Sequence, residues 1–176
     1  MEQRHRVTCT RNTQIDSGVM SIDFLVVGKT DSAQVADLTR LYAGRISRYL
    51  RFTVTELPDI RNAKNMSNES QKRAEGEMIL RTLSSDDYVV LLDDKGTEHT
   101  SLGFAEWIQK RMNSGVKRVV FVVGGPYGFS KEVYARASDK ISLSRMTFSH
   151  QIIRPIFAEQ LYRAFTILRG EPYHHE

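Results

Sequence analysis

Residues 119–128 read Val-Val-Phe-Val-Val-Gly-Gly-Pro-Tyr-Gly. Five consecutive apolar residues predict a short strand that is buried on both faces, as in a parallel sheet covered by helices. The strand runs directly into glycines, whose missing side chains let a ligand approach the backbone. A tight turn that needs positive φ explains the glycines equally well. The stretch therefore predicts an α/β fold with a candidate binding turn after residue 123.

Similar apolar segments recur on both sides of this stretch and alternate with segments of helical periodicity. Strands are expected at residues 22–27, 52–57, 88–92 and 140–143, and helices at 31–50, 70–83, 100–112, 131–137 and 150–168. This alternation predicts a mostly parallel, five- or six-stranded sheet with helices on both faces, in one domain over residues 20–176. Residues 1–19 are polar and lack periodicity, so we expect them to be an extension outside the domain.

The composition excludes several classes of protein. With 176 residues, 40% of them hydrophobic and 26% charged, the chain matches one soluble domain. It has no apolar run of the roughly 18–20 residues that span a membrane, and its polar start lacks the apolar core of a signal peptide. Its single cysteine, Cys9, excludes an internal disulfide, and its histidines show no metal-binding spacing. We expect a cytoplasmic protein without a metal.

Ligands of open parallel sheets bind outside the carboxyl ends of the strands. The first of these ends, Gly28-Lys29-Thr30, carries neither a dinucleotide fingerprint nor a phosphate loop, and no serine-nucleophile elbow occurs in the chain. Asp93-Asp94 could contact a ligand or act as a base, but an ordinary turn is favoured. Arg145 could bind an anion or be solvated. Arg45, Arg48 and Arg51 could contact RNA, although a solvated helix face is favoured.

Five motifs in order resemble one known family. They are Leu92-Asp93, Gly124-Gly125-Pro126, Leu143-Ser144-x-Met146-Thr147, Glu-Gln-Leu-Tyr-Arg-Ala at 159–164, and Pro172-Tyr173-His174. Together, over residues 20–176, they resemble the RlmH family, SPOUT-class methyltransferases of large-subunit ribosomal RNA.

The resemblance implies a trefoil-knotted α/β domain, although knots are rare in proteins. It also implies a homodimer that uses S-adenosyl-L-methionine to methylate N3 of pseudouridine 1915 in 23S rRNA, within the ribosome. The family's motifs place the cofactor at the carboxyl ends of the strands, where ligands of open parallel sheets generally bind. The candidate cofactor residues are Leu92, Asp93, Gly124, Gly125, Leu143, Ser144, Arg145, Met146, Thr147, Phe148 and Ser149.

Methylation of an imide nitrogen requires that its proton be removed, so a base or an anion-stabilising group is expected nearby. The resemblance suggests Tyr173, His174 and Arg154 as catalytic residues. Tyr173 would stack on or bracket the base, and His174 would contact it or accept the proton. The alternative is that the C-terminal tail is frayed and has no function. A dimer formed through the apolar side of the last helix would let each site use the neighbour's tail.

Three residues depart from the family pattern. Ser149 stands where a proline is common, and His175 stands where a basic residue is common. Pro155 falls inside the last helix pattern, so that helix should start late or bend near residues 151–154.

Two other functions are compatible with the sequence. One is a catalytically silent RNA- or ribosome-binding module on the same scaffold, and the other is an enzyme acting on a small phosphorylated metabolite. Residues 20–176 carry 22 basic against 19 acidic residues, a small excess that favours an assembled particle over free RNA as the substrate.

Overall fold

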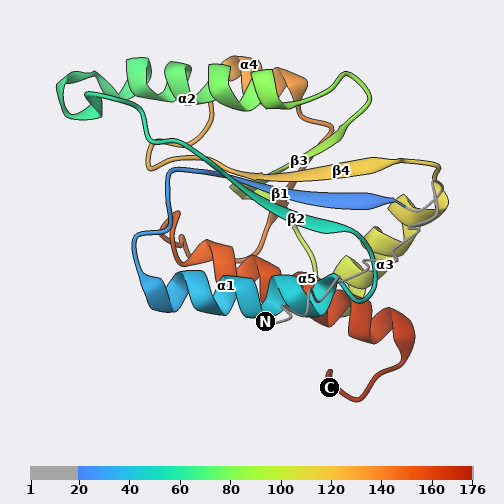
Figure 1. The fold of residues 1–176 in the computed structure, drawn as a ribbon. Coiled ribbons are helices and arrows are strands. Elements are labelled where there is room, and N and C mark those ends of the chain that lie inside the picture. Colours follow the sequence, from blue (N-terminus) through green and yellow to red (C-terminus); the bar gives the residue numbers. More distant parts are fainter. Residues whose placement is uncertain (1–19, 176) are drawn as a thin grey trace, which may run out of the picture.

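The computed structural model describes residues 20–175, so the extension predicted for residues 1–19 lies outside the described residues. Strands and helices alternate along the chain, as the sequence predicts (Figure 1). In chain order they are β1 (Ser21–Val27), α1 (Ala33–Ile46), β2 (Phe52–Leu57), the 3-10 turn η1 (Ala63–Asn65), α2 (Asn68–Thr82), β3 (Tyr88–Glu98), α3 (Ser101–Asn113), β4 (Arg118–Val123), α4 (Lys131–Arg136), β5 (Asp139–Ser142) and α5 (Ile153–Arg169).

All five strands form one parallel sheet in the order β2-β1-β4-β3-β5. Helices α2 and α4 cover one face of the sheet, and α1, α3 and α5 cover the other (Figure 1). The predicted parallel α/β architecture with helices on both faces is therefore confirmed, with five strands. The trefoil knot implied by the resemblance stays a prediction. Because the strands are parallel, their carboxyl ends share one edge of the sheet.

Strand β3 is longer than the predicted segment 88–92. It continues to Glu98 after an irregularity between Leu92 and Thr97, and both of these residues pair with Ile141 of β5. Gly96 lies in this irregularity, where a Cβ would be 2.6 Å from backbone atoms of Ile141. Only glycine permits this close approach, which keeps the end of β3 beside β5.

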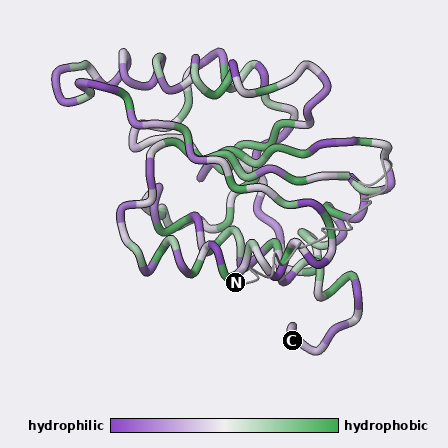
Figure 2. The backbone as a smooth tube through the Cα atoms, viewed as in Figure 1, coloured by the Kyte–Doolittle hydropathy of each residue, from purple (hydrophilic) through white to green (hydrophobic). Residues whose placement is uncertain are grey.

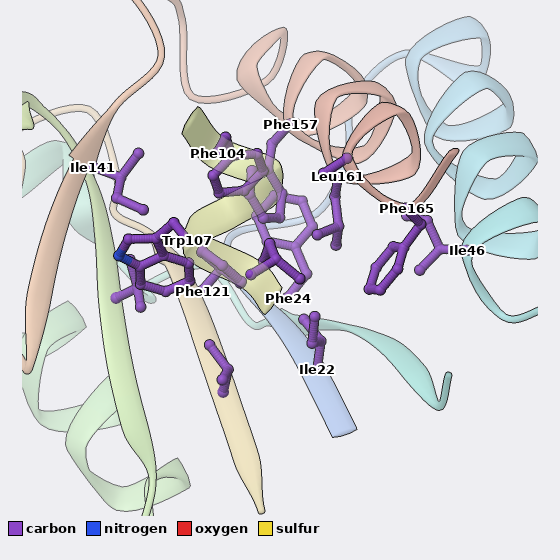
Figure 3. Close-up of a cluster of buried hydrophobic side chains, with 14 of the residues drawn as sticks. Ile22, Phe24, Ile46, Phe104, Trp107, Phe121, Ile141, Phe157, Leu161 and Phe165 are labelled. Atoms are coloured by element: carbon purple, nitrogen blue, oxygen red, sulfur yellow. The ribbon is translucent and has the colours of Figure 1, made fainter. Parts of the chain in front are cut away.

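The larger core cluster lies between the sheet and helices α1, α3 and α5. Figure 3 shows its aromatic centre, in which the ring of Phe157 lies 4.6 Å from that of Phe24 and 4.7 Å from that of Phe121. Phe157, Leu161, Ala164 and Phe165 of α5 are each at most 3% exposed in the single chain. The chain's own core therefore covers this part of the apolar side of α5, and the dimer face expected on that helix stays a prediction.

The opposite face of the sheet carries a second, smaller cluster. Leu25, Val89 and Val122 point into it and pack with Ile79 of α2 and Val133 of α4. Figure 2 shows the hydrophobic colours along the strands, between helices whose outer sides are hydrophilic. This double burial explains the nearly continuous apolar sequence of β4. Within residues 20–175, no helix combines the length and the apolarity that crossing a bilayer demands.

Helix α5 begins at Ile153, three residues later than the periodicity predicts. Pro155 therefore falls in its first turn, where the missing backbone N–H costs no helical hydrogen bond. The late start predicted from this proline is confirmed. The helix ends at Gly170, whose φ of 64° provides the predicted left-handed cap.

Arg154 joins the start of α5 to the end of β1. Its side chain is 1% exposed, and its guanidinium donates to the carbonyl oxygens of Val27 at 2.8 Å and Gly28 at 3.1 Å. It also donates to Thr30 Oγ1 at 2.8 Å and to the His150 carbonyl at 3.0 Å. The structure thus gives Arg154 a positioning role, because its donors serve carbonyl and hydroxyl groups of the same chain, and the catalytic role stays a prediction.

Substitution of this arginine tests the positioning role. Arg154→Met should lower the free energy of unfolding by about 3–5 kcal/mol, because it leaves buried carbonyl oxygens without donors. Urea denaturation measures the change. Arg145→Met is the matched control and should stay within about 0.5 kcal/mol, since the Arg145 side chain is 90% exposed. Unchanged stability of Arg154→Met together with lost activity would contradict the positioning role.

Candidate active site

A cavity of about 490 Å³ opens at the carboxyl ends of β3, β4 and β5. Three segments line it, at residues 92–94, 123–129 and 141–150, together with Tyr134 and Ile153. Ten of the eleven predicted cofactor residues are brought together there. They are Leu92, Asp93, Gly124, Gly125, Leu143, Ser144, Met146, Thr147, Phe148 and Ser149.

Arg145 is the exception among the predicted cofactor residues. It does not line the cavity, and its guanidinium Nε donates to Glu98 Oε2 at 3.2 Å on the surface. Of the two sequence interpretations for Arg145, the solvated arginine fits this position. The cavity therefore lacks the anion-binding arginine that a phosphorylated ligand would favour.

The walls of the cavity combine apolar and polar groups. Val123, Ile141 and Leu143 form its inner part, while Met146 is 77% exposed and Phe148 is 39% exposed at its lip. Large apolar side chains that remain exposed beside a cavity are typical of ligand or partner contact. The arrangement suits a flat, partly apolar molecule such as a nucleoside.

Hydrogen bonds within the chain shape the loop at residues 143–149. The Met146 amide donates to Ser144 Oγ at 2.9 Å, and the Ser142 hydroxyl donates to the Ser144 carbonyl at 2.9 Å. The Ile152 amide donates to Ser149 Oγ at 3.1 Å. The hydroxyl of Ser149 thus fixes the turn that leads to α5, where the family commonly has the rigid ring of proline.

The structure confirms the tight turn with positive φ, whereas ligand approach to the glycine backbone stays a prediction. Gly128 adopts a φ of +78°, and its amide donates to the Gly125 carbonyl at 3.2 Å, so the turn requires a left-handed residue. At Gly125 the constraint is a close approach instead, because a Cβ there would lie 2.6 Å from Oε1 of Glu75. A Cβ on Gly124 would lie 3.1 Å from the Phe129 ring.

Asp93 is a fixed anionic group in the cavity wall. Its carboxylate accepts hydrogen bonds from the Tyr134 hydroxyl and, at 2.8 Å, from the Lys95 amide. Burial opposes its ionisation, but these hydrogen bonds outweigh burial and hold the pKa of Asp93 below its usual value. Asp93 therefore shapes a turn, as the favoured interpretation expects, and it also lines the cavity.

Tyr173 and His174 lie away from the cavity of their own chain. The Tyr173 hydroxyl donates to Glu159 Oε1 at 3.1 Å and lies 3.3 Å from the Tyr42 hydroxyl, and His174 Nδ1 lies 3.4 Å from the Arg163 guanidinium. None of these partners lines the cavity. Burial and the hydrogen bonds to Tyr42 and Glu159 raise the pKa of Tyr173 above its ordinary value, so its hydroxyl stays protonated.

The three arginines that were considered for RNA contact have different surroundings in the structure. The guanidinium of Arg45 lies 5.3 Å from the Tyr42 ring centre and 5.5 Å from that of Tyr162, so it packs on aromatic side chains. Arg48 and Arg51 are exposed beyond the end of the helix. Within residues 20–175, no three acidic, histidine or cysteine side chains gather as metal ligands would.

Sequence reasoning missed Glu75, which lies against the glycine turn. Glu75 is 3% exposed in the middle of α2, and its Oε1 accepts from Gln71 Nε2 at 2.8 Å. The available signal was its spacing of four residues from the core residue Ile79, which places both on one face of the helix. A glutamate at an inward-facing position is an unusual choice that requires an explanation.

Comparison with known proteins agrees with the five motifs. A family model described as a predicted SPOUT methyltransferase matches residues 20–174. The ribosomal RNA large subunit methyltransferase H of Christiangramia forsetii is 53% identical over 156 residues, covering 89% of this chain and 99% of the relative. The protein of the same name from Parabacteroides distasonis is 55% identical over 157 residues, covering 89% of this chain and 100% of the relative. The chain therefore belongs to the SPOUT methyltransferases and, within them, to the RlmH family.

Proposed function

We propose that this chain transfers a methyl group from S-adenosylmethionine to N3 of pseudouridine 1915 in 23S rRNA, as a cytoplasmic homodimer acting on the assembled ribosome. The observation that carries the proposal is the cavity at the ends of β3, β4 and β5, which is built from the family's own motifs. Relatives at 50–55% identity are named as methyltransferases of large-subunit ribosomal RNA.

The residues of the cavity fit the cofactor. Its volume of about 490 Å³ lies within the range of small-molecule sites. Leu92 and Leu143 would enclose the adenine rings, and the backbone of residues 144–149 would bind their polar edge. Gly124 and Gly125 line the cavity and would present their backbone to the rest of the molecule. When bound, S-adenosylmethionine supplies an electrophilic methyl group on a sulfonium centre.

The protein itself needs to form no covalent bond in this reaction. A bond forms between N3 and the methyl carbon while the carbon–sulfur bond breaks, so holding the two reactants in line provides much of the rate. The N3 proton must also leave. A protonated Tyr173 is unsuited to accept it, so in this proposal Tyr173 brackets the base and His174 receives the proton or contacts the base.

A dimer would supply the tail that the cavity lacks in a single chain. Tyr173 and His174 lie on the outer side of α1 and α5, where α1 also exposes Leu38 by 45% and Leu41 by 49%. Two leucines three residues apart lie on one side of a helix. This exposed pair, rather than the covered apolar side of α5, is the dimer surface in the proposal. The tail of each chain would then reach the cavity of its neighbour.

The alternative of a silent ribosome-binding module differs in one respect, since such a module need not bind the cofactor. The structure favours the enzyme, because Gly125 and the loop at residues 143–149 keep an open cavity that RNA binding alone does not require. The third alternative, an enzyme for a small phosphorylated metabolite, is disfavoured because no lysine or arginine among residues 20–175 lines the cavity.

Methyl transfer to ribosomes tests the activity. With tritiated S-adenosylmethionine, the full chain should label ribosomes that lack this modification, and label free 23S rRNA at least about tenfold less, because the small basic excess cannot hold naked RNA strongly. Gly125→Val should abolish labelling, since its side chain would collide with Glu75. Gly44→Ala is the matched control and should keep activity, because nothing lies within 4 Å of a Cβ there. Labelling by Gly125→Val equal to that of the native chain would refute the assigned pocket.

Mixed dimers test the shared site. Gly125→Val damages the cofactor cavity, whereas His174→Ala should leave cofactor affinity unchanged and remove the tail's contribution. Each variant alone should be inactive. After subunit exchange, an equal mixture should recover about a quarter of native activity, because half of the dimers then hold one intact cavity facing one intact tail. Failure to recover activity, with exchange verified by mass spectrometry, would show that each chain uses its own tail.

A further inference from the structure

The carboxylate of Glu75 is a buried acceptor with one oxygen unused. Within residues 20–175, only three buried side-chain atoms lack a hydrogen-bond partner, and Glu75 Oε2 is the one beside the cavity. The other two, Arg111 Nε and His174 Nε2, belong to residues that do not line it. Buried polar atoms of native proteins are almost always paired, so an unpaired carboxylate oxygen indicates a donor that arrives from outside the chain.

The position of this oxygen is set by Gly125. The carboxylate occupies the space that a side chain at residue 125 would fill, with Oε1 2.6 Å from the position of a Cβ there. Gly125 itself lines the cavity, whereas Glu75 does not. The carboxylate therefore lies immediately behind the cavity wall at Gly125, one of three glycines in that wall. Because Oε2 is buried, a slender group of a ligand would reach it only with a small shift of the glycine turn, and a nucleotide base is too wide to do so.

The charges around Glu75 leave its anion poorly compensated. Burial raises the pKa of Glu75, and the hydrogen bond from Gln71 and the nearby His150 oppose this rise only in part. The carboxylate of Asp59 acts in the same direction as burial. Across the cavity, Asp93 already accepts from Tyr134 and from the Lys95 amide on its two oxygens. Asp94 also lines the cavity but is exposed to solvent, so Glu75 is the buried acidic group beside the cavity that has an unpaired oxygen.

We propose that Glu75 binds the α-ammonium group of the methionyl end of the cofactor, with Oε2 accepting a charge-assisted hydrogen bond past Gly125. This inference rests on the proposed use of S-adenosylmethionine. Among the groups of that molecule, the ammonium is the one that carries both a positive charge and N–H donors, as an unpaired carboxylate oxygen requires. Glu75 is then a binding residue that orients the methyl donor, and the absence of a side chain at Gly125 lets the ammonium group approach the carboxylate.

Glu75→Gln tests the inference with three ligands in calorimetric titrations of the full chain. S-adenosylhomocysteine carries the ammonium but no sulfonium, and 5′-methylthioadenosine carries neither. Glu75→Gln should weaken S-adenosylmethionine and S-adenosylhomocysteine by about tenfold or more, and should leave 5′-methylthioadenosine within about twofold of the native chain. Glu77→Gln is the matched control, since Glu77 lies on the same helix with its side chain 59% exposed, and it should change none of the three affinities.

Other outcomes overturn the inference in distinguishable ways. Equal weakening of all three ligands would mean that Glu75 only supports the glycine turn. Weakening of S-adenosylmethionine alone would assign Glu75 to the sulfonium, and unchanged affinities with lost turnover would assign it to proton transfer. If the native chain bound none of the ligands, the proposed function would fail as well, which separates that failure from a fault in the role of Glu75.

Discussion

Parallel pairing of β3 with both β4 and β5 is the constraint on which the site depends. It brings the irregular part of β3 at residues 92–94 and the loops after β4 and β5 to one edge of the sheet, where they enclose a cavity. The strands can align this way because they are buried on both faces and need helical crossovers between them. Gly96 lets β3 and β5 stay in contact beyond the cavity. The position of the cavity therefore follows from strand pairing and core packing, independently of the functional residues that line it.

At this edge of the sheet, different residues position the walls of the cavity and bind the ligand in the proposal. Arg154 fastens the start of α5 to the end of β1 and so fixes the last wall of the cavity, although it contacts no ligand-accessible space. Glu75 belongs to the helical layer on the opposite face of the sheet, and its carboxylate lies behind the cavity wall at Gly125. Tyr173 and His174 lie on the outside of the chain, so in the proposed dimer the reacting nucleotide is enclosed only when two copies meet.

Much of the architecture could be predicted from sequence, because apolar periodicity reports burial directly. The buried strand at 119–123, the late start of α5 at Pro155 and the Gly170 cap follow from local rules that tertiary contacts did not override. Ten of the eleven candidate cofactor residues lie at one cavity because the motifs coincide with strand ends. The strand order, the extension of β3 and the roles of Arg154 and Glu75 depend on contacts between distant residues. Glu75, for example, is adjacent to Gly125 only after α2 packs on the sheet.

The central claim is that the carboxyl edge of β3, β4 and β5 holds the methyl donor. Backbone amide shifts measured by NMR during titration with S-adenosylhomocysteine test this most directly. The account predicts that the largest shifts fall on the segments 92–94, 123–129 and 141–150, whose residues apart from Tyr127 and Arg145 line the cavity, with smaller shifts around Glu75 in α2. Shifts concentrated instead on α1 and the tail at residues 170–175, with the cavity residues unmoved, would contradict it.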